Sequence, residues 1–116
     1  MKYLMAPIWF ASFFEKASVS RTRRETRCRN VLLQPGARDM VHRHDAHAFV
    51  YVLEGEIVMQ LKGQPAVTLS AGQTFYEGPT DVHVVGRNAS TTEPARFVVV
   101  LLKAKGAPIL TPVQDQ

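Results

Sequence analysis

A chain of 116 residues, of which 46% are hydrophobic and 21% charged, is long enough for one hydrophobic core and too short for two. This composition argues against intrinsic disorder. The formal net charge of +4 leaves a nucleic-acid surface open as a function. The chain has one cysteine, so an intrachain disulfide is excluded. We expect Cys28 to be a small apolar strand residue, with a reactive thiol as the alternative.

The first 20 residues form an apolar segment that has two interpretations. One lysine precedes an uncharged, mostly apolar run over residues 3–14, as in a short signal peptide. However, Pro7 interrupts this run, charged residues follow it at once, and it is too short to span a membrane. We therefore expect residues 1–20 to be an apolar arm or short helix of a cytoplasmic protein without a stable membrane span, and export through a signal-like segment is the alternative.

A basic stretch follows, in which arginines alternate with other polar residues. Its charged residues are Arg21, Arg23, Arg24, Arg27 and Arg29, together with the single Glu25. Such alternation is typical of the exposed face of an edge strand, where charge also discourages pairing with other sheets. Because no recognition helix and no stacking aromatic residues accompany the arginines, we expect no nucleic-acid partner.

From residue 21 to residue 106 the sequence is typical of an all-β domain. Turn signals recur about every 8 to 10 residues, and runs rich in Val, Phe, Tyr and Leu lie between them. The signals are Pro35-Gly36, Glu54-Gly55, Lys62-Gly63, Ala71-Gly72, Gly78-Pro79, Gly86 and Glu93-Pro94. This spacing predicts a sandwich or barrel over residues 21–106, followed by a C-terminal tail over residues 107–116.

Two of the predicted strands, over residues 48–53 and 97–102, are apolar on both faces. In the first, the even-numbered residues face one side and the odd-numbered residues face the other. An antiparallel strand with one face in water should alternate between apolar and polar residues. We therefore expect both faces to be covered, the outer one by a second sheet, the N-terminal arm or another subunit. The pattern favours a double-sheet barrel that forms a homodimer.

Three of the four histidines lie close together at positions 42, 44 and 47. His42 and His44 are two residues apart on a predicted strand, so both imidazoles leave the same face of it. The pair alone is a weak signal, but a turn precedes it, an apolar strand follows it, and His83 lies in another predicted strand. Three histidines from two strands of one small barrel suit a mononuclear site for a divalent transition metal, namely Fe, Mn, Ni, Cu or Zn.

Two segments resemble the conserved motifs of the cupin family. Residues 35–56, PGARDMVHRHDAHAFVYVLEGE, are similar to the first motif, and residues 71–88, AGQTFYEGPTDVHVVGRN, are similar to the second. Both motifs in this order are far more specific than either alone, and the resemblance covers residues 25–103. It implies a jelly-roll β-barrel, also called a double-stranded β-helix, which is usually dimeric and holds a metal inside. The family's three histidine ligands correspond to His42, His44 and His83.

The chain departs from the family pattern at the usual fourth ligand. That ligand is a glutamate four or five residues after the second histidine, where this chain has Ala48 and Phe49. One candidate substitute is His47, although strand alternation would point it away from the side of Ala48. The other is Glu77, whose direction alternation leaves open because a Gly-Pro loop follows it. Asn88 also comes one residue later than in the family pattern, which predicts a β-bulge.

A site with three histidine ligands leaves coordination positions open, as catalytic metal sites do. By resemblance, we expect a metal-dependent dioxygenase acting on a small oxygenated substrate such as an enol, catechol or diketone; isomerases and lyases share the scaffold. The alternative is a non-catalytic barrel that binds a small-molecule ligand. The candidate catalytic residues are Glu77, Tyr51 and Tyr76, and the candidate substrate-binding residues are Gln60 and Arg96.

Overall fold

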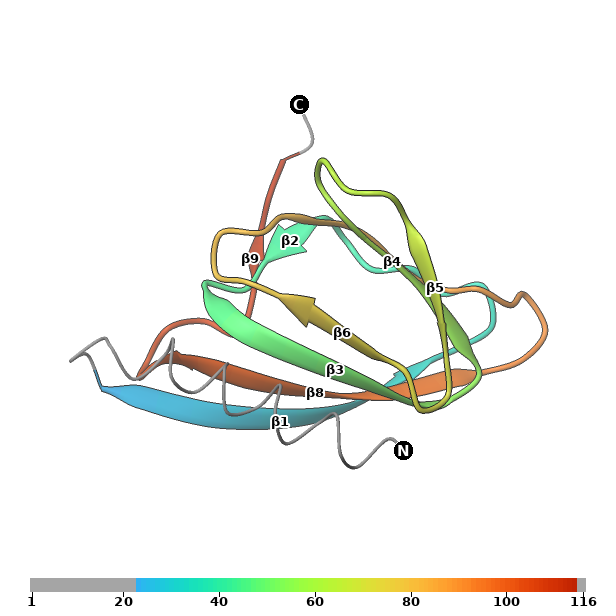
Figure 1. Ribbon diagram of the computed structural model, residues 1–116, viewed down its shortest axis with the longest axis horizontal. Coiled ribbons are helices and arrows are strands. Elements are labelled where there is room, and N and C mark those ends of the chain that lie inside the picture. The colour runs from blue at the N-terminus through green and yellow to red at the C-terminus, as the bar shows by residue number, and fades with distance from the viewer. Residues whose placement is uncertain (1–22, 115–116) are drawn as a thin grey trace.

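The computed structural model describes residues 23–114, which form two β-sheets and contain no helix (Figure 1). The strands are β1 (Arg24–Leu33), β2 (His42–Arg43), β3 (Ala46–Glu54), β4 (Glu56–Leu61), β5 (Val67–Ser70), β6 (Thr74–Glu77), β7 (His83–Asn88), β8 (Ala95–Ala104) and β9 (Thr111–Pro112). The arm expected over residues 1–20 lies outside the described residues. Within residues 23–114, no helix is long and apolar enough to cross a membrane.

The two sheets are antiparallel and face each other. One sheet has the strand order β1-β8-β3-β6, and the other has the order β5-β4-β7-β2-β9 (Figure 1). Strands that are distant in the chain pair with each other, as β1 does with β8 and β2 with β7. This topology is that of a jelly roll, so the all-β, double-sheet prediction is confirmed.

The inner and outer faces of β3 differ sharply in burial. Ala48, Val50 and Val52 are at most 2% exposed and face the interior, where each fully buried Val contributes about 1.5–3 kcal/mol to stability. On the other face, exposure increases along the strand, from 7% at Phe49 to 37% at Tyr51 and 43% at Leu53. Because a shift by one residue would exchange these two faces, burial of the inner set fixes the pairing register of β3.

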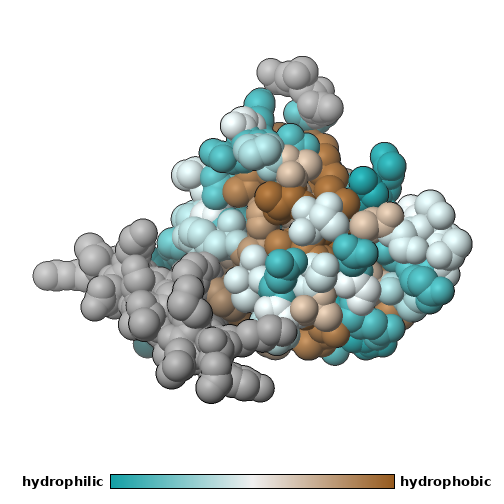
Figure 2. Space-filling view, turned by 45° about the vertical axis from the view of Figure 1, so that its right-hand side comes forward, coloured by the Kyte–Doolittle hydropathy of each residue, from teal (hydrophilic) through white to brown (hydrophobic). Residues whose placement is uncertain are grey.

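The hydrophobic core lies between the sheets and joins β3 to strands from both. Ile57 and Met59 of β4 and Val99 and Leu101 of β8 pack with the inner face of β3. On the surface, hydrophobic residues gather in the middle of one face, between hydrophilic ones (Figure 2). The basic strand β1 lies at the edge of its sheet, as its sequence predicted, and residues 26–30 are exposed.

Most of the turns predicted at glycines can be compared directly with the structure, and one of these predictions is wrong. Gly55 joins β3 to β4 with φ +72°, and a Cβ there would lie 2.6 Å from the carbonyl oxygen of Pro94, so only glycine fits. The turn predicted at Gly86 is wrong, because Gly86 lies inside β7. The register between β4 and β7 shifts near His83, as the predicted bulge requires.

Asn88 ends β7 and connects three loop segments. Its side-chain amide donates to the carbonyl oxygens of Leu33, Gln34 and Glu93, and its Oδ1 accepts a hydrogen bond from the backbone N–H of Ser90. Asn88 is 3% exposed and has almost no access to water, so these bonds satisfy its polar atoms inside the protein. This network holds the end of the barrel opposite the start of β7, where His83 lies.

Candidate metal centre

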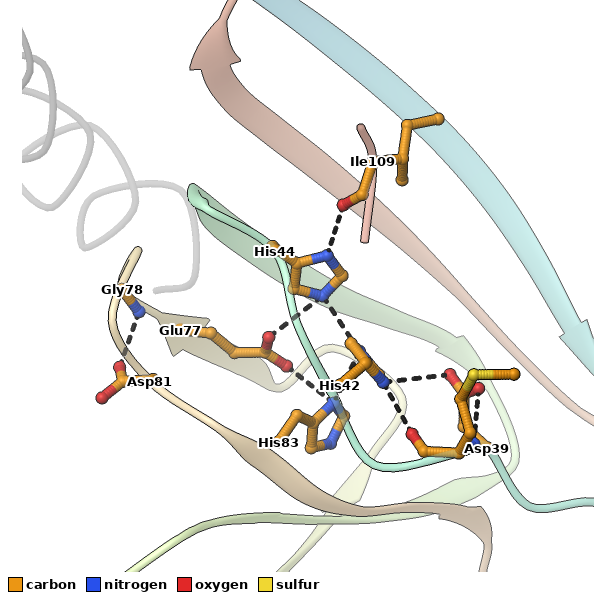
Figure 3. Close-up of polar contacts among 9 residues, drawn as sticks. Asp39, His42, His44, Glu77, Gly78, Asp81, His83 and Ile109 are labelled. Carbon is orange, nitrogen blue, oxygen red and sulfur yellow. Dashed lines mark hydrogen bonds and ion pairs between the residues drawn. The ribbon is translucent and has the colours of Figure 1, made fainter. Parts of the chain in front are cut away.

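Four buried side chains meet inside the barrel. Each of His42, His44, Glu77 and His83 offers one ligand atom, and these atoms all lie within 4.8 Å of one another. Figure 3 shows the three imidazoles and the carboxylate pointing toward a common centre. All four residues are at most 9% exposed.

Neighbouring ring nitrogens and carboxylate oxygens of this group lie 3.0–3.3 Å from one another. Nε2 of His42 lies 3.2 Å from Nε2 of His44 and 3.3 Å from Nδ1 of His83. The carboxylate of Glu77 bridges the other two histidines, with Oε1 3.0 Å from Nδ1 of His83 and Oε2 3.1 Å from Nε2 of His44. Ring nitrogens and carboxylate oxygens facing one another in this way suit a shared cation.

Strand pairing explains why these side chains meet. His42 of β2 lies directly opposite His83 of β7, and His44 leaves the same face as His42 two residues later. Glu77 of β6 lies directly opposite Ala48 of β3. Opposite residues of an antiparallel pair project from the same face of the sheet, so Glu77 points inward with Ala48, whose methyl group leaves room for the longer side chain.

Two backbone carbonyls orient the histidine rings. Nδ1 of His42 lies 2.8 Å from the carbonyl oxygen of Met40, and Nδ1 of His44 lies 2.9 Å from that of Ile109. Because a carbonyl only accepts hydrogen bonds, Nδ1 carries a proton in both rings, and in the neutral form of each ring the lone pair is on Nε2. In each ring Nε2 is the nitrogen that faces the group, so the neutral ring can donate this lone pair to a metal.

Buried polar atoms without a hydrogen bond provide a test of whether a cation fits. Within residues 23–114, two buried side-chain atoms are of this kind, Oε2 of Glu77 and Nε2 of His83. Only Oε2 of Glu77 bears on the cation, because Nε2 of His83 lies on the Gly86 side of its ring, whereas Nδ1 faces the group. The 3.1 Å contact between Glu77 Oε2 and His44 therefore brings the atoms close without hydrogen-bond geometry. A buried carboxylate oxygen without a hydrogen bond is costly, and a cation beside it would offset that cost. Three imidazoles and one carboxylate are a donor set that fits a divalent transition metal.

The electrostatics of the group keep the carboxylate ionised. Burial by itself would raise the pKa of Glu77, but the neighbouring imidazoles of His44 and His83 hold this pKa at about 2. Burial would likewise lower the pKa of His44, yet the contact with Glu77 and the bond to the Ile109 carbonyl raise it above its ordinary value. Glu77 is therefore an anion at neutral pH, as a metal ligand must be.

The group opens onto a cavity of about 420 Å³, a size typical of small-molecule pockets. Its walls are mostly apolar side chains of β3, β4 and β8, including Val50, Met59, Phe97, Val99 and Leu101. Ile109 and Leu110, from the segment expected as a tail, also line it. This segment continues into β9, which pairs with β2 beside His42.

The other candidate residues lie elsewhere. His47 is outside the group of four, and its Nδ1 lies 2.6 Å from the hydroxyl oxygen of Tyr76, with the two rings stacked. Gln60 bonds to the carbonyl of Gln64, and Arg96 approaches Glu54. These residues and Tyr51 are absent from the cavity lining of the described chain, and Glu77 alone of the catalytic candidates belongs to it.

Three polar contributions to the cavity were not predicted from the sequence. Arg29 and Asp39 line the cavity as charged groups, and Ile109 contributes a carbonyl to His44. In sequence, Arg29 could not be distinguished from the other arginines of the edge strand. Asp39 offered a signal, since it is an acidic residue three positions before His42. A backbone carbonyl has no signal in sequence at all.

Gly86 leaves the space that the His83 ring fills. A Cβ at Gly86 would lie 2.9 Å from Cε1 and 3.1 Å from Nε2 of His83. We expect Gly86→Ala to displace this ring and to weaken metal binding about tenfold or more, because substitutions of residues that support a metal ligand have effects of this size. Competition with a chromophoric chelator would measure the dissociation constant.

The matched control is Gly63→Ala. Gly63 has φ +82°, and a Cβ added there would have no atom within 4 Å, so this change strains the backbone by about 1 kcal/mol without touching a ligand. It should lower the Tm and leave metal affinity unchanged. A Gly86→Ala protein with wild-type metal affinity would contradict the role assigned to Gly86.

Fold and site together define a small β-barrel with a buried His/Glu group that could hold a metal. The family model of the cupin domain matches residues 29–101, which is more than half of the chain. The chain therefore belongs to the cupin domain family. No curated protein matches it.

Solved structures with similar folds include proteins of different activity. A cupin-like protein of Thermotoga maritima has 23% identity and a TM-score of 0.67, over 78% of this chain and 65% of that chain. The DMSP lyase DddQ of Ruegeria pomeroyi has 18% identity and a TM-score of 0.66, over 83% and 47%. The oxalate decarboxylase OxdC of Bacillus subtilis has 22% identity and a TM-score of 0.64, over 83% and 25%. At these identities the likeness shows the fold alone, and this chain spans less than two thirds of each protein.

Proposed function

We propose that the protein is a mononuclear metal-dependent enzyme that acts on a small oxygenated substrate. The proposed ligands are His42, His44, Glu77 and His83, and the metal is Fe, Mn, Ni, Cu or Zn. The observation that carries the proposal is the meeting of these four buried donors at one side of an apolar cavity. A structural metal site would be closed by its ligands, whereas this group opens onto space for a ligand.

The residues of the chain have separate tasks in such an enzyme. A bound divalent metal would supply Lewis acidity and, as Fe or Mn, reactivity with O₂. The carbonyls of Met40 and Ile109 keep two imidazoles aligned, and the Glu77 carboxylate offsets part of the metal's charge. The apolar walls position the rest of the substrate and exclude bulk water from the reacting atoms.

A dioxygenase of enols, catechols or diketones is the reaction that we favour, with isomerases and lyases as other outcomes. Four protein ligands leave open positions on a six-coordinate ion, enough for a chelating substrate or O₂. Similar folds in an oxalate decarboxylase and a DMSP lyase support decarboxylase or lyase chemistry on this scaffold. The second candidate function is a non-catalytic module that binds a small ligand, which the apolar cavity also suits.

Turnover assays with metal-loaded protein separate these functions. Protein loaded in turn with each of the five metals would be incubated with catechol, acetylacetone, oxalate and DMSP. We expect O₂ consumption or a product detected by mass spectrometry for at least one pair, and none with metal-free protein. Saturable binding without any product would favour the binding module.

We also propose that the protein is a homodimer. Tyr51 and Leu53 of β3 are 37% and 43% exposed, and Tyr76 on the neighbouring strand β6 projects from the same face, since it lies beside Phe49 in the pairing register. Light scattering at micromolar concentration should give twice the mass of the chain, and Leu53→Glu should give a monomer. The control Val67→Glu changes an exposed apolar residue on β5, which belongs to the other sheet, and should stay dimeric. A monomeric wild type would contradict the proposal.

A cytoplasmic location is the last part of the proposal, with export as its alternative. It is supported by Pro7, which interrupts the apolar run, and by the charged residues that follow this run. Fractionation of cells that express the full chain distinguishes the two locations.

A further inference from the structure

Arg29 brings a positive charge to the cavity. On β1, Arg29 lies directly opposite Val99 of β8, and Val31 lies opposite Phe97. Opposite residues share a face, and all four of these side chains line the cavity. Arg29 is itself exposed, so this residue lies where the cavity meets solvent.

The neighbouring arginines do not share this position. Arg27 is on the same face of β1, two residues earlier, but its guanidinium lies 3.5 Å from Glu25 and it does not line the cavity. Arg96 lies beside Glu54 and Asn30. Within residues 23–114, the side chain of Arg29 makes no hydrogen bond or ion pair, and Arg29 is the one Arg or Lys that lines the cavity. Its five donors are therefore available to a ligand.

The acidic groups of the cavity are already engaged. Glu77 is held by His44 and His83, and Oδ1 of Asp39 accepts a hydrogen bond from the N–H of Met40. The other carboxylate oxygen of Asp39 lies 3.9 Å from the ring of His42. A divalent ion together with Arg29 outweighs these two carboxylates, so the metal-loaded cavity carries net positive charge. Such a cavity selects anions.

We propose that the substrate is a small organic acid whose carboxylate binds Arg29 while its other oxygens face the four proposed metal ligands. This inference rests on the proposed function and specifies its substrate class. A guanidinium pairs with a carboxylate through two parallel hydrogen bonds. The apolar walls between Arg29 and the ligand group would contact the carbon skeleton, so the acid carries its carboxylate at one end and its metal-binding oxygens at the other.

Two matched chelators test this. Acetylacetone and succinylacetone both bind metals through a β-diketone, and succinylacetone adds a carboxylate on a flexible chain. Calorimetry would measure the binding of each to metal-loaded wild type, Arg29→Gln and Arg27→Gln, with metal content and Tm recorded for every sample. We expect wild type and Arg27→Gln to bind the acid about 10- to 100-fold more tightly than the neutral diketone, and Arg29→Gln to lose this preference.

The outcomes distinguish the inference from the function on which it rests. Wild type that retains no metal would overturn the proposed function. Metal-loaded wild type without a preference for the acid, or Arg29→Gln with the preference intact, would overturn the role of Arg29 alone. Equal losses in Arg29→Gln and Arg27→Gln would indicate general attraction by the basic strand and would also overturn it.

Discussion

Protein purified with His83→Ala is expected to retain almost no metal, whereas untagged wild type should hold close to one ion per chain. His83 supplies one of four donors, and changes that only disturb the support of a ligand already cost 10- to 100-fold in affinity. We therefore expect a loss of at least about 100-fold. Plasma mass spectrometry of the two proteins, prepared side by side, would measure metal content and identify the metal.

Thermal unfolding gives a second measurement of the same prediction. Metal present at about 100 times its dissociation constant adds about 2.7 kcal/mol to the stability of wild type. For a domain of this size that corresponds to a rise in Tm of about 10 °C or more. His83→Ala should show no such rise. An equal rise in both proteins would place the metal elsewhere in the chain, and no rise in either would leave the ligand-binding module as the better function.

Much of the fold could be predicted because strand burial leaves a direct pattern in sequence. The two-sided apolar run of β3 and the Gly55 turn each follow from local sequence, and both are present in the structure. Gly86 was misread because a glycine in a strand and a glycine in a turn look alike in sequence. What distinguishes them is the His83 ring beside Gly86, a contact that depends on the bulge in β7.

The candidate site could be predicted only where its residues lie on one strand or belong to a motif. Spacing alone indicated that His42 and His44 share a face. The direction of Glu77 stayed open because it depends on the pairing of β6 with β3, and local alternation does not give the register between strands. The resemblance to the family drew attention to Ala48 as a missing acid, and the structure places a carboxylate opposite that alanine on the adjacent strand.

Glu77 lies in the group of four and His47 does not, so we expect substitutions of these two residues to affect metal affinity differently. Glu77→Gln keeps the size of the side chain but removes the charge that faces the histidines, so we expect metal affinity to fall about 100-fold. His47→Ala removes the contact with Tyr76, which is outside the group of four. We expect it to cost about 0.5–1.5 kcal/mol of stability and to leave metal affinity within about threefold of wild type.

Chelator competition on both variants decides between the two candidates for the fourth ligand. The double variant Ala48→Glu/Glu77→Ala is the sharpest control. It moves the carboxylate from β6 to the directly opposite position on β3, the strand that carries the acid in the family pattern. If the cavity needs an acid at this place rather than on a particular strand, the double variant should bind metal more tightly than Glu77→Ala alone. Severe metal loss in His47→Ala, with Glu77→Gln unaffected, would instead make His47 the ligand and leave Glu77 as a buried partner of the histidines.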